Sequence, residues 1–97
     1  MTMHNPPHPG EFIRSVYLEP FGMSARSLAI SLAVSPSTLN RIITGKSGIS
    51  PDMALRLSRA LGRSAESWLA MQDQYDLWQA RQNPQLEQVR PVDSKVA

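Results

Sequence analysis

Apolar residues recur along this chain at intervals of three and four positions, the spacing that places side chains on one face of an α-helix. Prolines and glycines divide the pattern into five helix-sized segments, and no useful length of sequence alternates with the period of a strand. The first segment begins at Pro9 and ends at the run Pro20, Phe21 and Gly22. Its inward side consists of aromatic and β-branched residues: Phe12, Ile13, Val16 and Tyr17.

Serine marks the start of each of the four following segments. Ser24 and Ser64 can cap helices, and Ser35 and Ser50 are each followed by proline, which favours the first helical position. Gly62 is suited to a helix end. The inward residues of the second, third and fourth helices are small or apolar: Leu28, Ala29, Leu32, Leu39, Ile42, Ile43, Ala54, Leu57 and Leu61. The pattern predicts an all-α protein.

The length of 97 residues suits one domain with a single core. Residues 1–8 are rich in proline and are expected to form an extended N-terminal segment. Residues 9–82 are expected to form the helical domain, whose C-terminal helix is closed by Asn83 and Pro84. Residues 83–97 lack periodicity, which predicts a flexible tail.

The stretch from Ser24 to about Thr44 has the features of a helix-turn-helix. Two predicted helices are separated by about three residues, so their backbones must cross steeply and closely. Ala29 supplies the small residue that such a crossing needs, and Gly45 stops the second of these helices. Apolar residues occupy the positions expected to fill the wedge between them: Leu28, Leu32, Val34, Leu39 and Ile42.

The helix that follows Ser35 has a polar side opposite its apolar stripe. Short polar side chains near a helix N-terminus let the helix enter the major groove of DNA and reach base edges. Arg41 stands one turn later, where it could reach a guanine or a phosphate. The polar side consists of Ser37, Thr38, Asn40, Arg41 and Thr44.

The distribution of charge agrees with an anionic partner on one side of the molecule. The net charge is only +2, but no acidic residue lies between Glu19 and Asp52. Arg26 and Lys46 in this window suit phosphates, which fix register without reading sequence. Arginine continues beyond it at Arg56, Arg59 and Arg63, and the C-terminal third carries the acidic residues Glu66, Asp73, Asp76, Glu87 and Asp93. On charge alone, an ordinary solvated surface is the alternative.

Catalysis and metal binding find little support in the sequence. There is no cysteine, and His4 and His8 are separated by Pro6 and Pro7, which prevent a helix from aligning the two rings. No serine stands in a nucleophile elbow, so no catalytic residue, metal ion or cofactor is expected. Without a secretory signal or about 18 consecutive apolar residues, we expect a cytoplasmic protein with no membrane association.

Trp68, Met71, Tyr75 and Trp78 recur at near-heptad intervals along the last predicted helix. Such a stripe most often covers a core. Because a domain of this size has limited room for two tryptophans, we expect partial burial together with a homodimer contact along this helix. A dimer would hold two recognition helices about 34 Å apart, one turn of DNA.

Residues 23–45, MSARSLAISLAVSPSTLNRIITG, resemble the helix-turn-helix of Xre/Cro-type repressors. Three flanking segments, HPGEFIR at 8–14, GISPDMALRL at 48–57 and WLAMQDQYDL at 68–77, are similar to the HigA (VapI-like) antitoxin branch of that family. The resemblance implies a five-helix lambda-repressor-like domain, a homodimer and binding to a palindromic operator in double-stranded DNA. It also implies an antitoxin that represses its own operon and neutralises a RelE-like ribonuclease toxin, HigB, in a type II toxin-antitoxin pair.

The resemblance assigns DNA-contacting positions to Ser35, Ser37, Thr38, Asn40 and Arg41. This chain departs from the family at two places. Ala25 stands where a glutamine amide usually contacts a phosphate, and Arg26 is the candidate to replace that anchor. Ala33 stands where the turn usually has glycine, and a left-handed alanine should cost about 1 kcal/mol or somewhat more.

Two alternatives stay open at the level of sequence. One is a solitary Xre-type regulator without a toxin, and the other is an interaction module that keeps the fold but does not bind DNA. A toxin would meet either the N-terminal segment or the acidic C-terminal third of the chain. We favour the acidic third, because RelE-like toxins are basic.

Overall fold

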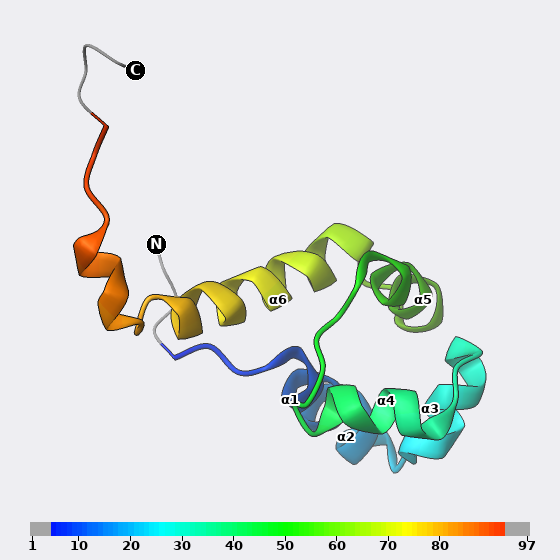
Figure 1. Ribbon diagram of the computed structural model, residues 1–97. Coiled ribbons are helices and arrows are strands. Elements are labelled where there is room, and N and C mark those ends of the chain that lie inside the picture. Colours follow the sequence, from blue (N-terminus) through cyan, green and yellow to red (C-terminus); the bar gives the residue numbers. More distant parts are fainter. Residues whose placement is uncertain (1–4, 93–97) are drawn as a thin grey trace.

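The computed structural model describes residues 5–92, and within that range it contains helices and no strand (Figure 1). The all-α class predicted from the sequence is confirmed. His4 and Asp93 lie outside the described residues. The elements in chain order are α1 Pro9–Ile13, η1 Arg14–Leu18, α2 Glu19–Phe21, α3 Ala25–Leu32, α4 Pro36–Ile43, α5 Pro51–Leu61, α6 Ala65–Ala80 and η2 Pro84–Gln88.

The first helical rod consists of α1, η1 and α2, which follow one another without a break and carry the chain through Pro20 to Phe21. A proline inside an α-helix clashes with the carbonyl four residues earlier. Here η1 is a π-turn, with the Glu19 N–H bonded five residues back to the Arg14 carbonyl, and this wider turn accommodates the ring. Gly22, in the left-handed conformation, ends the rod within the predicted run Pro20, Phe21 and Gly22, and of these three residues the glycine, not the proline, stops the helix. The wider turn also leaves Val16, predicted to face inward, 40% exposed.

The other four helices begin at the predicted serines. In each, the serine Oγ accepts a hydrogen bond of 3.1 Å from the backbone N–H three residues on, at Ser24, Ser35, Ser50 and Ser64. Gly62 adopts the left-handed conformation at the end of α5, as predicted. These bonds satisfy N–H groups that the first turn of a helix leaves without partners.

Trp68 stands at the centre of the core and has no exposed surface. Its ring meets Phe12 edge to face at 5.8 Å and lies 6.2 Å from Tyr17, so it joins α6 to the first helical rod. The prediction that Trp68 takes part in a dimer contact is therefore wrong, because its side chain has no surface to offer a second chain. The first rod and α6 leave between them enough room for one whole indole, and the sequence did not reveal that room.

α1 and α4 approach each other at Gly10. A Cβ added at Gly10 would stand 1.9 Å from the carbonyl oxygen of Ile42, so only glycine fits between these backbones. On the other side of the molecule, α6 packs on α5 and α1 (Figure 1). α4 is therefore held from behind by α1, which α6 holds in turn.

Beyond α6 the chain leaves the body of the molecule (Figure 1), and the described residues, this segment included, measure 57 × 25 × 22 Å. The short 3-10 helix η2 gives local structure to a segment predicted to be a tail, and Asn83 Oδ1 caps it by accepting from the Gln85 N–H. Residues 81–92 are all exposed, and we call them the C-terminal arm. No helix in the described range is long and apolar enough to span a membrane.

Candidate nucleic-acid interface

α3 and α4 form the predicted helix-turn-helix, joined by Ala33, Val34 and Ser35. Ala29 is fully buried at their crossing, as predicted. The apolar residues predicted to fill the wedge are buried at Leu28, Leu32, Leu39 and Ile42 and half-buried at Val34. This packing leaves the opposite side of α4 free to face outward.

Ala33 has the left-handed conformation that the turn requires, with φ 58° and ψ 42°. The Val34 N–H donates to the Ala29 carbonyl and the Ala33 N–H to the Ile30 carbonyl, each at 3.1 Å. This is a Schellman ending of α3, built with alanine where glycine would fit without strain. The fold thus keeps a left-handed turn at Ala33 at a cost of about 1 kcal/mol.

The N-terminal end of α4 presents three neighbouring hydroxyl groups. Ser35 Oγ lies 3.2 Å from Ser37 Oγ and 2.8 Å from Thr38 Oγ1, and all three residues are exposed. Each hydroxyl can rotate to donate or accept, so together they suit base edges or phosphate oxygens beyond a helix N-terminus. The structure therefore brings together three of the predicted contact residues.

Further along α4, Asn40 and Arg41 are exposed, and the described residues give their side chains no hydrogen bond or ion pair. Thr44 differs, because its hydroxyl donates to the Asn40 carbonyl at 2.8 Å. It retains only acceptor capacity for a ligand. Of these three predicted contact residues, Asn40 and Arg41 have the free donors that discriminate bases.

The predicted phosphate anchors differ in what they can offer. Arg26, in the first turn of α3, and Lys46, after α4, are both exposed. Ala25 is half-buried against the core, so only its backbone N–H is available at the start of α3. Arg26 and Lys46 therefore stay the predicted phosphate contacts, and both side chains are accessible.

Two of the three arginines beyond that window have structural partners that the charge pattern did not predict. Arg56 bonds to Asp52 and to two backbone carbonyls at the end of α3. Arg63 stacks over the Phe12 ring at 5.0 Å and donates to Ser67 at 2.8 Å. The basic surface is thus smaller than the sequence indicates, because guanidinium groups next to aromatic rings or helix ends serve packing.

Gln72 is buried and was missed by the sequence analysis. Its Oε1 accepts from the Ile49 N–H at 2.8 Å, and its Nε2 donates to Asp76 at 3.0 Å. Through this bond to Ile49, Gln72 connects the segment between α4 and α5 to α6. Its position one turn after Trp68, on the same helix face, was the signal that could have revealed it.

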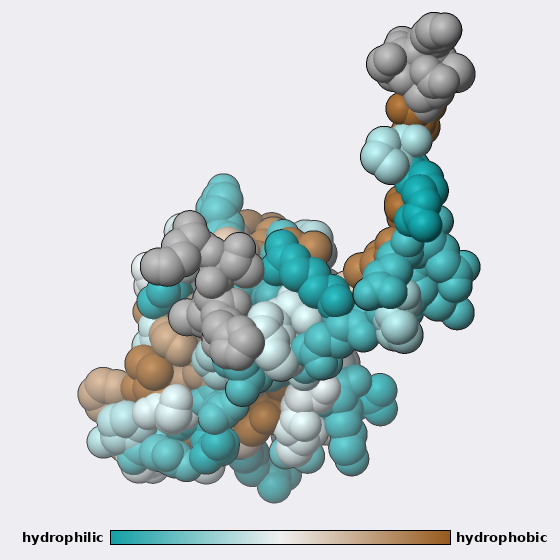
Figure 2. Space-filling view, turned by 90° about the vertical axis from the view of Figure 1, so that its left-hand side faces the viewer, coloured by the Kyte–Doolittle hydropathy of each residue, from teal (hydrophilic) through white to brown (hydrophobic). Residues whose placement is uncertain are grey.

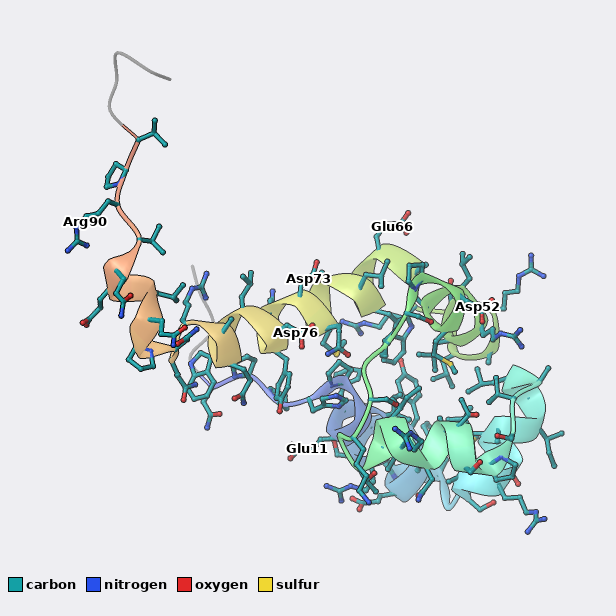
Figure 3. All side chains as sticks on the ribbon, in the orientation of Figure 1. Glu11, Asp52, Glu66, Asp73, Asp76 and Arg90 are labelled. Atoms are coloured by element: carbon teal, nitrogen blue, oxygen red, sulfur yellow. The ribbon has the colours of Figure 1, made fainter. Side chains whose placement is uncertain are left out.

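Of the remaining residues of the aromatic stripe, Tyr75 contacts the chain's own N-terminal segment. The ring of Tyr75 meets His8 edge to face at 4.9 Å, and Met71 packs against the core. Met71, Tyr75 and Trp78 are all half-buried. Figure 3 shows Glu66 and Asp73 on the side of α6 away from α3 and α4, and Asp76 on the side toward them.

Comparison with known proteins agrees with this geometry. Residues 16–68 match the family model described as helix-turn-helix. Virulence-associated protein I of Dichelobacter nodosus is 53% identical over 80% of this chain and 72% of its own length. Antitoxin HigA-1 of Vibrio cholerae is 35% identical over 89% of this chain and 81% of its own.

A solved structure gives the same result. The antitoxin HigA of Pseudomonas aeruginosa, solved with the higBA promoter, is 40% identical, with a TM-score of 0.82 over 91% of this chain and 99% of that one. The likenesses extend well beyond the helix-turn-helix on both sides. The chain therefore belongs to the HigA (VapI-like) antitoxin branch of the helix-turn-helix family.

Proposed function

We propose that this protein is a sequence-specific DNA-binding antitoxin that represses its own operon and neutralises a RelE-like (HigB) ribonuclease toxin. The observation that carries the proposal is the exposed polar side of α4, whose other side is buried in the core. The similarity to a HigA antitoxin solved with its promoter supports the same function. We place the protein in the cytoplasm, where operator and toxin are found, and infer no enzymatic activity.

In the proposed complex, α4 lies in the major groove. Ser37, Asn40 and Arg41 face base edges there, because they share the exposed side of the helix. Arg26 and Lys46 bind phosphates on either side. The hydroxyl groups of Ser35 and Thr38 at the helix N-terminus add contacts to the backbone or to the first base pair.

The experiment is a gel shift with DNA from upstream of the protein's own gene and with a scrambled fragment of equal length. Binding that prefers the upstream DNA by about a thousandfold or more is expected of a specific operator. Equal, weak binding to both fragments would mean that the protein binds DNA without sequence specificity. No binding at all would favour the alternative of an interaction module that does not bind DNA.

We propose a homodimer through the C-terminal part of α6 and the C-terminal arm. Leu77 is 51% exposed, and Trp78 next to it is half-buried. Three more apolar side chains are exposed along the arm, Leu86, Val89 and Val92 (Figure 2). Apolar surface of this kind on a small protein is typical of a protein interface. Trp68 is excluded from this contact, and Met71 and Tyr75 contribute only their exposed edges.

Glu66 and Asp73, on the outward side of α6, are the residues we propose for the toxin (Figure 3). Their carboxylates complement a basic toxin surface, and they face away from the proposed DNA-binding helix. The test is co-purification with the product of a neighbouring toxin-sized reading frame. Glu66→Lys combined with Asp73→Lys should release that product without changing the gel shift. The lack of any such neighbouring frame would favour the solitary regulator.

A further inference from the structure

Arg56 reaches from α5 to the turn of the helix-turn-helix. Its Nη1 donates to the carbonyl of Leu32 at 2.9 Å and to that of Ala33 at 3.0 Å. Its Nε donates to Asp52 Oδ2 at 2.8 Å. The guanidinium is thus oriented by a carboxylate on its own helix and directed at the end of another.

The two carbonyls that Arg56 binds need such a partner. The last carbonyls of a helix have no intrahelical donor and lie at the negative end of the helix dipole. The Schellman bonds at the end of α3 use the carbonyls of Ala29 and Ile30, but not those of Leu32 and Ala33. Arg56 therefore provides both the missing donors and the favourable charge.

The position of Ala33 makes this contact more than an ordinary helix cap. Its φ of 58° is a conformation in which alanine is strained and glycine is not. Arg56 holds the carbonyl of that same residue, so its bond opposes relaxation of the turn. Two residues later, Ser35 caps α4. The turn therefore decides where the recognition helix begins and in which direction it points.

We propose that Arg56 is a positioning residue for DNA recognition, which holds the strained turn at Ala33 and through it the N-terminal end of α4. The inference rests on the proposed function, since it assigns Arg56 a part in operator binding without contact to DNA. The competing role is that of an ordinary phosphate contact, as the charge pattern alone suggests.

The test is a double-mutant cycle with Arg56→Met and Ala33→Gly, measured as affinity for the upstream DNA and for scrambled DNA over a range of salt. Arg56→Met should weaken upstream binding by about tenfold or more and leave scrambled binding and the salt slope unchanged. Ala33→Gly should restore most of the loss, because glycine adopts the turn without strain. On its own, Ala33→Gly should bind like the wild type.

Arg59→Met is the matched control, because it removes the same charge from an exposed site on the same helix. It should leave the preference for upstream over scrambled DNA unchanged. Circular dichroism of each variant shows that it is folded. Arg56→Lys, which offers a charge without the planar donor pair, should restore only part of the affinity.

Three results would overturn the inference. One is weaker binding of Arg56→Met to scrambled DNA, together with a fall of about 1 in the slope of log affinity against log salt concentration. That combination would mean that Arg56 contacts a phosphate. Another is wild-type affinity in Arg56→Met. The third is a loss that Ala33→Gly does not reduce. If the wild type itself does not prefer the upstream DNA, the proposed function is wrong, whatever the role of Arg56. Amide hydrogen exchange at residues 33–35, compared between the wild type and Arg56→Met, then tests separately whether Arg56 stabilises the turn.

Discussion

The imidazole of His8 lies where the N-terminal segment, α1 and α6 meet. Its Nδ1 accepts from the Gly10 N–H at 2.9 Å and so caps α1, while its ring contacts Tyr75. A nitrogen that accepts this bond carries no proton, so the cap needs neutral histidine. Burial lowers the pKa of His8 below 6.5, partly offset by the Asp76 charge and a hydrogen bond with the Ser47 backbone.

This lowered pKa makes stability depend on pH in a known direction. Below pH 6.5 the unfolded chain binds a proton at His8 that the folded chain resists, so stability rises with pH in that range. We expect the contribution of His8 to the free energy of unfolding, measured in urea, to be greatest above pH 6.5. It should fall as the pH drops toward the pKa of His8 in the folded protein. His8→Asn, whose amide oxygen can cap without titrating, should show a flatter profile. Parallel profiles would contradict this role.

Arg41 carries the residue-scale prediction for recognition. Its guanidinium is exposed on α4, and the described residues leave its hydrogen-bond donors available to a ligand. If it reads a guanine, Arg41→Ala should lose about 1–3 kcal/mol of operator binding and relax specificity at one base pair. Fluorescence anisotropy with single-base operator variants measures both effects. Arg59→Ala, which removes an exposed arginine on α5, is the control. A uniform loss over all operator variants would assign Arg41 to a phosphate instead.

At the scale of elements, three supports hold the recognition helix in place. α1 packs behind it at Gly10, Gln72 on α6 fastens the segment that follows it, and Arg56 on α5 holds the turn before it. Each support comes from a different helix, and none touches the exposed side of α4. This arrangement leaves that side free for a ligand while its orientation stays rigid.

Gly10→Ala tests the support from α1. The added methyl would overlap the Ile42 carbonyl, so α1 and α4 must move apart. Overpacking of this kind costs about 1–3 kcal/mol. Urea unfolding should show that loss, and Ser15→Ala, at an exposed site of the same helical rod, should show almost none. An unchanged midpoint in Gly10→Ala would mean that the two helices adjust to each other freely.

The whole molecule has two parts of different character. The N-terminal part packs around Trp68, whereas the end of α6 and the C-terminal arm extend beyond that body with apolar side chains exposed (Figure 2). A second copy that covers them would place two recognition helices on one side of DNA.

Leu77→Asp tests the dimer. A charge at the proposed contact should raise the dimer dissociation constant by at least about tenfold in analytical ultracentrifugation. Trp78→Ala should act in the same direction. Ile30→Asp changes another exposed apolar residue, on α3, and should leave the dimer intact. A tight dimer in Leu77→Asp, or a monomeric wild type, would contradict the proposed contact.

The features that the sequence determined are local ones. Helix starts depend on a serine and the N–H three residues on, and the helix-turn-helix depends on Ala29 and the apolar residues next to it. Such interactions span about one turn of chain, so a pattern read along the sequence contains them. The exposed side of α4, with Asn40 and Arg41, follows directly from that pattern.

Tertiary structure alone decided which distant side chains meet. Whether Trp68 is core or surface depended on the space beside Phe12 and Tyr17, which lie more than 50 positions earlier in the chain. Whether Arg56 faces DNA or the turn depended on where α5 crosses α3. Pro20 stays helical only because the turn before it widens. The burial of a side chain and the partner of its hydrogen bond depend on which distant residues become its neighbours. Only the packed chain determines those neighbours, so a pattern read along the sequence does not contain them.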